Sequence, residues 1–276
     1  MIPLTVIIIT KNEGHNIQRT LESIHQLTDD IIIVDSGSSD DTLTIAKQFQ
    51  TKIIETNWDG FGANKNKGIA KSKYNWIFSL DADEVVDHEL LQSLRNKTFF
   101  NEEIAFSLKF NVLIGNSILN YGRGTSKKIR IFNKKKANWS NNLLHEELKF
   151  NSAIQIEDLP GRILHYSYRN IDHCIHKTQS YTTLAAEQMF ISHRQSSFIK
   201  IYLDPIYTFL ISYIFRLGFL DGFYGYTYAR MNSYYCFLKY VKLFELNKNK
   251  EIHYEAGLFH VAPPPLINQP DKVTLN

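Results

Sequence analysis

The amino-acid sequence predicts an α/β fold: a mostly parallel sheet with helices on both faces, followed by a helical, aromatic-rich C-terminal extension. In the first hundred residues, short apolar runs alternate with segments whose apolar residues recur every three or four positions. From about residue 170 the pattern is helical throughout. Hydrophobic residues make up 43% of the 276-residue chain and charged residues 21%, which supports a packed core.

Each predicted strand is a run of apolar or β-branched residues, as is typical of parallel strands buried on both faces. These strands are expected at residues 4–9, 31–34, 52–55 and 76–80. Helices are expected at residues 16–27, 62–70 and 87–95. Another helix is expected to begin after a cap at residues 38–41. Further strand-like runs occupy residues 105–114 and 128–132.

The pattern divides the chain into a nucleotide-binding and catalytic domain at residues 1–169, a helical region at residues 170–250 and an extended tail at residues 251–276. The cysteines, Cys174 and Cys236, do not suggest a disulfide framework, so we expect a reducing, cytoplasmic location. The N-terminus has no basic leader, and no run approaches the roughly 20 uncharged apolar residues that span a bilayer.

Polar side chains follow three of the predicted strands at the point where each strand ends. Since the carboxyl ends of parallel strands meet at one edge of a sheet, where ligands bind, we expect these groups to converge. The alternative for each is a solvated loop or a helix cap. The residues are Thr10, Asn12 and Glu13 after the first strand, Asp35 after the second, and Asp81 and Asp83 after the fourth.

The Asp81-Ala82-Asp83 segment predicts a metal site. If it is extended, residues i and i+2 point the same way and the two carboxylates lie side by side. Their repulsion is relieved by a cation, and Mg²⁺ takes one or two protein carboxylates together with waters and phosphates. The rival interpretation is an acidic cap for the helix near residue 87.

Missing motifs and modest charge disfavour several other classes of protein. The first strand is not followed by a Gly-x-Gly-x-x-Gly fingerprint or a Walker-type lysine, which disfavours dinucleotide-dependent dehydrogenases and P-loop proteins. The net charge of +3 is too small to argue for nucleic acid. Asp35, Asn12 and Glu13 instead suit a nucleoside, whose hydroxyl and imino groups donate hydrogen bonds to carboxylates.

The ordered set of motifs resembles the family 2 inverting glycosyltransferases with a GT-A, Rossmann-like fold. Within that family it is similar to the lipopolysaccharide core β-glucosyltransferases of Gram-negative bacteria, which use UDP-glucose to extend the inner-core heptose. The motifs are Thr10-Lys11-Asn12-Glu13, Val34-Asp35-Ser36-Gly37-Ser38-Ser39-Asp40, Trp58-Asp59-Gly60-Phe61-Gly62 with Lys65-Asn66, Asp81-Ala82-Asp83-Glu84, Arg130-Ile131-Phe132, Leu144-His145-Glu146 and His165-Tyr166-Ser167-Tyr168.

The resemblance implies a role for each matching position on the donor side. Asp83 would bind Mg²⁺ or Mn²⁺, and Asp81 would face the ribose or the metal. Lys65, which could offset phosphate charge, and Asn66 would lie near the donor. The uridine would be held by Thr10, Asn12, Glu13 and Asp35.

The general base that deprotonates the acceptor hydroxyl is expected in the second half of the chain, and Glu146 is the candidate. Glu147, its neighbour, would point to the other face of an extended segment, and Glu84 is a weaker candidate for the base. Arg130 would either anchor the acceptor or pair with a local acid. His145 and His165 are further candidate site residues, and His165 could reach the metal or the diphosphate.

Residues 198–244 hold 16 of the 33 Phe and Tyr residues (18 Phe and 15 Tyr) and more basic than acidic side chains. Such helices suit the membrane interface, where aromatic rings and basic groups both find favourable surroundings. The alternative is a helical lid with an ordinary aromatic core.

The leading hypothesis is therefore an enzyme on the cytoplasmic face of the inner membrane that transfers glucose from UDP-glucose to lipopolysaccharide core. The alternatives are a UDP-sugar transferase acting on another surface glycan or on polyprenyl phosphate, and a non-catalytic nucleotide-sugar-binding membrane protein.

Overall fold

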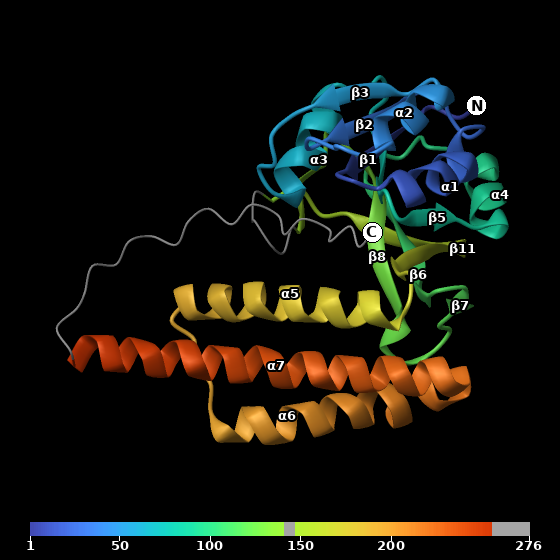
Figure 1. Cartoon of the computed structure of the whole chain (residues 1–276). Helices are drawn as coiled ribbons and strands as arrows, with labels where there is room; N and C mark the ends of the chain where they lie inside the picture. Colours follow the sequence, from blue (N-terminus) through green and yellow to red (C-terminus); the bar gives the residue numbers. More distant parts are fainter. Residues whose placement is uncertain (141–146, 256–276) are drawn as a thin grey trace. The chain divides into compact units, whose positions relative to one another are not determined.

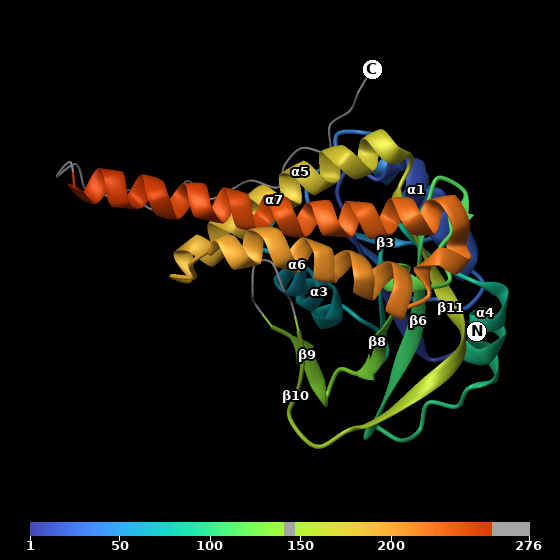
Figure 2. The ribbon, with the colours of Figure 1, turned by 90° about the horizontal axis from the view of Figure 1, so that it is seen from below.

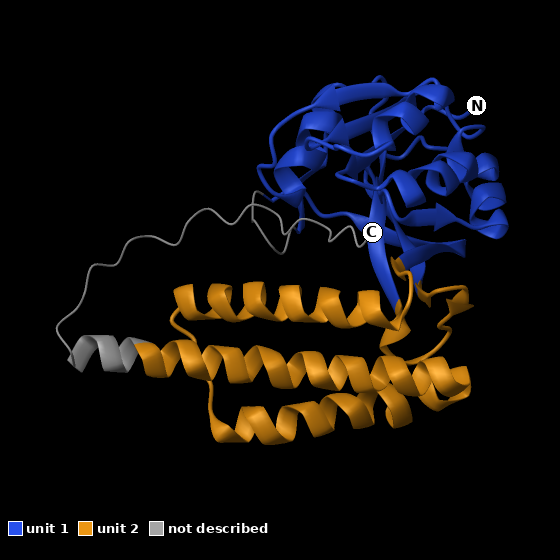
Figure 3. Cartoon of the chain, viewed as in Figure 1, with its two compact units in different colours: residues 1–111, 126–166 blue, residues 112–125, 167–276 orange. Residues whose placement is uncertain are grey.

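The computed structural model describes residues 1–140 and 147–255 (Figure 1). The chain forms two compact units, one of residues 1–111 and 126–166 and the other of residues 112–125 and 167–276 (Figure 3). The second unit therefore combines the chain from residue 167 onward with a segment from its middle.

The first unit is built on a sheet whose first half is parallel. Strand β1 pairs in parallel with β2 on one side and with β4 on the other, and β3 extends the sheet beyond β2. This half confirms the predicted strands, which are β1 (Leu4–Thr10), β2 (Ile31–Asp35), β3 (Lys52–Glu55) and β4 (Trp76–Asp81).

The second half of the sheet contains antiparallel pairs, so the sheet as a whole is mixed. Strand order among the described residues is β3-β2-β1-β4-β8-β6-β11-β5, and β8 and β5 run antiparallel to β4 and β11. The short strand β7 (Ser117–Ile118) pairs with the end of β6. The remaining strands are β5 (Glu84–Val86), β6 (Ile104–Ile114), β8 (Thr125–Asn133) and β11 (Gln155–Tyr168).

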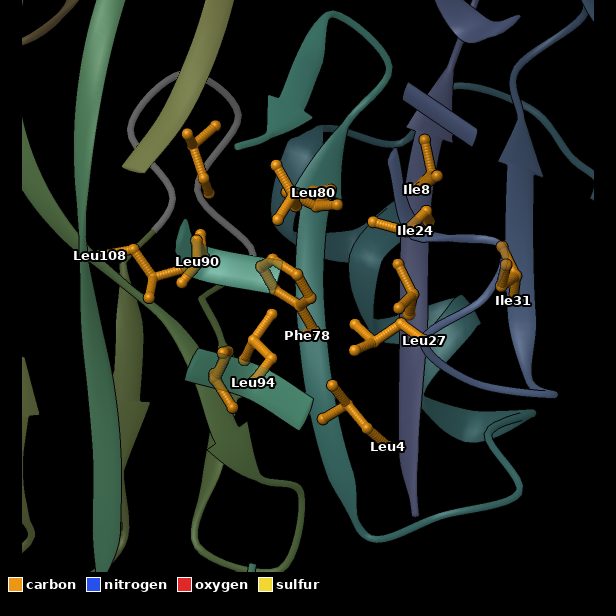
Figure 4. Close-up of a cluster of buried hydrophobic side chains, with 14 of the residues drawn as sticks. Leu4, Ile8, Ile24, Leu27, Ile31, Phe78, Leu80, Leu90, Leu94 and Leu108 are labelled. Atoms are coloured by element: carbon orange, nitrogen blue, oxygen red, sulfur yellow. The ribbon is translucent and has the colours of Figure 1, made fainter. Parts of the chain in front are cut away.

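Alternating side chains along the central strands place a core on each face of the sheet. Leu4, Val6 and Ile8 of β1 join one buried cluster, while Ile7 and Ile9 join the other. Figure 4 shows the first cluster, to which helices α1 (Gly14–Ile24) and α4 (His88–Asn96) contribute. Helix α3 (Phe61–Ala70) packs on β1 and β2 and contributes to the second cluster, so helices cover both faces as predicted.

Two local features complete the first unit. The short helix α2 (Thr42–Ala46) follows β2, and Asp40 accepts a hydrogen bond from the backbone N–H of Thr42 at its start. Strands β9 (Ala137–Trp139) and β10 (Leu148–Phe150) form a separate antiparallel hairpin, with Trp139 opposite Leu148.

The second unit consists mainly of three long helices that lie side by side, α5 (Ile171–Ile191), α6 (Phe198–Leu210) and α7 (Gly222–Glu255) (Figures 1 and 2). Helix α7 packs against both of the others. A π-helical turn (Ile211–Phe215) and a 3₁₀ turn (Gly218–Asp221) connect α6 to α7. Among the described residues, Phe198–Phe215 is long and apolar enough to cross a membrane. It contains Lys200 and Asp204, so a search for uncharged runs does not select it.

Candidate active site

The polar ends of the three central strands meet at one edge of the sheet. In the register of the parallel strands, Thr10 lies beside Asp35 and Ile9 lies beside Asp81. Neighbouring strands are about 4.8 Å apart, so the backbones of Asp35 and Asp81 are separated by about two strand spacings, roughly 10 Å. The three groups of side chains therefore start from adjacent positions, as expected from the sequence.

Four charged side chains interact at the end of β4. Lys65 Nζ lies 3.3 Å from Asp81 Oδ1, and a terminal guanidinium nitrogen of Arg130 lies 3.2 Å from Asp81 Oδ2. The same nitrogen donates to Glu84 Oε1 at 2.7 Å, and Glu84 Oε2 accepts from the backbone N–H of Asp81 at 2.9 Å. Lys65, Arg130 and Glu84 are buried, whereas the Asp81 side chain is 31% exposed. The cluster thus has one open member, the Asp81 carboxylate.

The two acids of this cluster differ in pKa. For Asp81, burial favours the neutral acid, but the charges of Lys65 and Arg130 outweigh it and hold the pKa well below its usual range. For Glu84, complete burial raises the pKa, and the adjacent Asp81 charge adds to this, against the opposing effect of Arg130. Asp81 is therefore the firmly ionised acid of the pair.

The chain turns immediately after Asp81, so the prediction that Asp81-Ala82-Asp83 is extended is wrong. Ala82 and Asp83 form a turn between β4 and β5. Thr20 of α1 donates to the carbonyl of Ala82 at 2.8 Å and holds this turn in place. The Asp83 carboxylate lies 3.4 Å from His165 Nε2, so the two aspartates have different partners.

The rival cap interpretation of the acidic pair is also wrong. Helix α4 is capped by Asp87, whose side chain accepts hydrogen bonds from the backbone N–H groups of Leu90 and Arg162. The cap of α4 is therefore Asp87 and not Asp81 or Asp83.

Asp35 organises the loop that follows β2. Its carboxylate accepts hydrogen bonds from the backbone N–H groups of Gly37 and Ser38, at 3.0 and 2.8 Å, and from the hydroxyl of Ser38. Gly37 has φ = 83°, a conformation that costs glycine little. Asp35 is only 1% exposed, and the hydrogen bonds of its carboxylate stabilise its own loop. Contact between Asp35 and a nucleoside stays a prediction.

The loop after β1 is joined to the loop after β2. The backbone N–H of Asn12 donates to the Ser38 hydroxyl at 2.9 Å, and Asn12 Oδ1 accepts from the N–H of Ser39 at 2.8 Å. Glu13 is buried, and its carboxylate accepts from the Asn16 side chain. The buried Thr10 hydroxyl has no hydrogen-bond partner among the described residues, which leaves it available to a ligand.

Helix α3 fixes the base of the β9–β10 hairpin. Asn66 Nδ2 donates to the carbonyl of Trp139 at 2.9 Å, and its Oδ1 accepts from the Trp139 N–H at 3.1 Å. Lys65 Nζ lies 4.6 Å from the centre of the Trp139 ring. Ser140 and Glu147 close the hairpin through two hydrogen bonds, one of which runs from the Ser140 N–H to the Glu147 carbonyl at 2.8 Å.

Two candidate residues, His145 and Glu146, lie outside the described residues. Glu147 is exposed at the hairpin base. Arg130 pairs with two local acids, which is the structural alternative expected for it. Glu84, the weaker candidate for the base, is completely buried against Arg130 and cannot reach an acceptor.

Trp139 was not selected from the sequence, although it bridges Lys65 and Asn66. Its nearness to them depends on a pairing between residues that are 73 positions apart. The only local signal is a tryptophan a few residues before the Leu144-His145-Glu146 motif.

A family model described as glycosyl transferase family 2 matches residues 5–159, which is more than half of the chain. The chain belongs to glycosyltransferase family 2. The matched region contains the charged cluster, the three strand ends and the β9–β10 hairpin.

Curated relatives of this glycosyltransferase cover most of its length. An uncharacterized glycosyltransferase of Rickettsia typhi is 28% identical over 88% of the chain and 87% of its own length. The lipopolysaccharide core biosynthesis glycosyltransferase LpsC of Rhizobium meliloti is 26% identical over 88% of the chain and 93% of its own length.

Among solved structures, the glycosyltransferase is similar to TarS of S. aureus, with a TM-score of 0.43 and 15% identity over 59% of this chain and 36% of that one. It is also similar to glucosyl-3-phosphoglycerate synthase of Mycobacterium tuberculosis in complex with Mn²⁺ and UDP, with a TM-score of 0.31 and 21% identity over 41% and 44% of the two chains.

Proposed function

We propose that this glycosyltransferase transfers a hexose from a UDP-sugar, with UDP-glucose as the leading donor, to the inner-core heptose of lipopolysaccharide. The main support for a nucleotide-sugar donor is the cluster of Lys65, Asp81 and Arg130 at the carboxyl end of β4. The relationship to LpsC over most of both chains supports lipopolysaccharide core as the proposed acceptor.

The donor's diphosphate would lie beside the open Asp81 carboxylate and above Lys65. A buried ammonium is costly unless it is paired, and Lys65 is paired with the one partly exposed acid of the cluster. Its charge would offset that of the diphosphate. The uridine would occupy the joined loops after β1 and β2, where the Thr10 hydroxyl is available and Asn12, Glu13 and Asp35 fix the backbone.

The residues present fit a divalent cation, Mg²⁺ or Mn²⁺. Asp83 and His165 lie 3.4 Å apart and are both partly exposed, and a carboxylate and an imidazole are suitable ligands for Mn²⁺. Water and the donor's phosphates would complete the shell of such a cation. Asp83 and His165 would hold the cation, with Asp81 nearby. When bound, it would stabilise negative charge on the diphosphate.

The reaction would be a single displacement with inversion, as the family resemblance implies. The acceptor oxygen forms a bond to the anomeric carbon while the bond from that carbon to the diphosphate oxygen breaks, and UDP leaves. The hydroxyl proton passes to a carboxylate, for which Glu146 is the candidate. The described strand that precedes Glu146 in the chain supports this role, because its Trp139 is hydrogen-bonded to Asn66 and lies beside Lys65.

The acceptor implies a location on the cytoplasmic face of the inner membrane, with peripheral attachment to lipid. Both are proposals that follow from a lipid-linked acceptor and from a second unit rich in exposed apolar side chains.

The test is UDP release by the purified full chain, with a panel of UDP-sugars and with heptose-containing core lipid as acceptor. We expect UDP-glucose to give the fastest turnover, and Glu146→Gln to abolish transfer while UDP binding by calorimetry stays normal. If turnover occurred only with polyprenyl phosphate or another glycan, that compound would replace the core heptose as the proposed acceptor. UDP binding without turnover on any acceptor would make the protein a nucleotide-sugar-binding protein rather than an enzyme.

A further inference from the structure

We infer that the outer face of α6, together with the turn that leads into α7, is a docking surface that inserts into the interface of an anionic lipid bilayer without crossing it. This inference deepens the membrane association proposed above by naming the inserted face, its depth and the lipid class. It does not depend on sugar transfer, and the experiment below separates the two.

Helix α6 has an inner and an outer face that differ sharply in burial. The inner face is buried and consists of residues three or four positions apart, namely Ile201, Pro205, Thr208 and Ser212. The outer face carries large apolar side chains that are between 36% and 68% exposed, namely Phe198, Ile199, Tyr202, Leu203, Ile206, Tyr207, Leu210 and Ile214. A continuous exposed row of this kind marks an interaction site rather than ordinary surface.

The turn between α6 and α7 extends the same apolar character. Phe215 is 73% exposed and Phe223 is 70% exposed, and between them Leu217, Phe219 and Leu220 are each about half exposed. The described residues 198–223 therefore present a nearly unbroken apolar surface.

Close backbone contacts hold this turn rigid. A side chain at Gly225 would come within 2.0 Å of the Gly218 carbonyl oxygen, and one at Gly218 would come within 2.5 Å of the Ser212 carbonyl oxygen. Leu217 adopts φ = 59°, a left-handed conformation that is unfavourable for a branched residue. The exposed side chains are thus presented by a fixed scaffold rather than by a loose loop.

Charge around this face favours anionic lipid. Among described residues 191–249, the exposed charged side chains are five bases and one acid: Arg194, Lys200, Arg216, Arg230, Lys248 and Glu245. Asp221 is half-buried, and its carboxylate accepts hydrogen bonds from the backbone N–H groups of Asn120 and Tyr121. The apolar surface is therefore bordered by net positive charge, which anionic headgroups attract.

The segment suits the interface better than a transmembrane path. Phe198–Phe215 has 18 residues, which as a helix would measure about 27 Å against roughly 30 Å of hydrocarbon. Lys200 and Asp204 lie within it, and its inner face is occupied by α7, which carries Arg230, Lys239 and Lys242. A helix that lies in the membrane plane would bury only the outer face, to a depth of about 5–10 Å.

The first arm of the test is flotation of the full chain with vesicles of phosphatidylcholine, with and without phosphatidylglycerol. We expect flotation with both and stronger flotation with the anionic vesicles. Phe215→Ser with Phe223→Ser should lower vesicle partitioning at least tenfold. Phe100→Ser, at an 87% exposed phenylalanine of the first unit, is the matched control and should have no effect.

The second arm tests charge. Arg216→Gln with Arg230→Gln should weaken binding to anionic vesicles about fivefold for each charge removed, and should leave binding to neutral vesicles unchanged. Lys71→Gln with Lys149→Gln, two exposed lysines of the first unit, is the control.

The third arm measures depth. The native tryptophans, Trp58, Trp76 and Trp139, all belong to the first unit, so Phe215→Trp adds a single reporter to this face. Brominated lipids should quench it most strongly when the bromine is near the headgroups. Strongest quenching from the bilayer centre would show a spanning segment and overturn the inference.

Two further outcomes would also overturn it. One is a chain that does not float, or that floats equally well in the Phe215→Ser, Phe223→Ser variant. The other is a lipid-independent dimer in sedimentation experiments that this variant dissociates, which would make a second copy the occupant. UDP binding by calorimetry should be the same in every variant, so loss of flotation with intact UDP binding leaves the transferase proposal standing.

Discussion

Lys65 Nζ lies 3.3 Å from Asp81 Oδ1, and the lysine is the more buried partner, with its side chain 1% exposed against 31% for the aspartate. The ammonium comes from α3 and the carboxylate from the end of β4. A buried cation beneath a partly open acid holds positive charge close to where the donor's diphosphate would bind. Because the cation is fixed before the ligand arrives, no reorganisation is needed to stabilise charge that develops during the reaction.

Replacement of Lys65 by Met should reduce UDP release by about 10²-fold or more, because a preorganised positive charge beside the leaving diphosphate is lost. Steady-state UDP release with saturating donor measures this. Lys67→Met is the matched control, two residues along the same helix, because Lys67 pairs with the exposed Asp59 at the surface. Equal activity in the two variants would remove Lys65 from the proposed site.

Replacement of Arg130 by Met should lower the free energy of unfolding by about 3–5 kcal/mol, because Glu84 would lose its cation while remaining completely buried. Urea denaturation measures the change. Arg130→Lys should restore little of it, since an ammonium cannot reproduce the guanidinium's contacts with both Asp81 and Glu84.

Two controls accompany the Arg130 variants. Lys127→Met, at an exposed pair with Asp158, should change stability by less than about 1 kcal/mol. The double variant Arg130→Met, Glu84→Gln should recover part of the loss, since it removes the orphaned acid. An Arg130→Met protein as stable as the parent would show that the cluster is not important for folding.

Removal of divalent metal with excess chelator should suppress UDP release, and Mn²⁺ or Mg²⁺ should restore it. Asp83→Asn should abolish this restoration, because its carboxylate is the proposed ligand closest to His165. A readout other than activity is Mn²⁺ binding in the presence of UDP, followed by electron paramagnetic resonance. Asp59→Asn, at an exposed surface acid, should bind Mn²⁺ as the parent does. Full turnover in chelator would contradict the metal assignment.

The apolar pattern of the sequence was enough to predict the parallel half of the sheet. Strands such as β1 and β2 are buried on both faces, and their sequences are therefore almost entirely apolar. It could not predict β5, a three-residue strand whose existence depends on its partner β11. The order of the strands made the convergence of Thr10, Asp35 and Asp81 predictable.

The contacts within the candidate site were less predictable than its location. The pairing of Arg130 with Asp81 and Glu84 requires β8 to lie next to β4, which no local pattern specifies. The turn at Ala82–Asp83 was missed because a polar Asp-x-Asp segment after a strand fits an extended or a turning backbone equally well.

Cys174 should make the protein less stable at alkaline pH. Burial raises the pKa of its thiol from 9.0 to about 11. Between these values the unfolded chain releases the proton while the folded chain keeps it, so the folded state binds more protons and stability falls as pH rises. The loss should reach about 2–3 kcal/mol by pH 11. Urea denaturation from pH 8 to pH 11 measures it.

Cys174→Ala should reduce this pH dependence, most clearly between pH 9 and pH 10, although it also lowers stability at every pH by removing a buried side chain. Burial also raises the pKa of Tyr228 to about 12, so a residual decline above pH 10 should persist in this variant. If Cys174→Ala had the same slope as the parent between pH 9 and pH 10, the thiol would not be the group responsible.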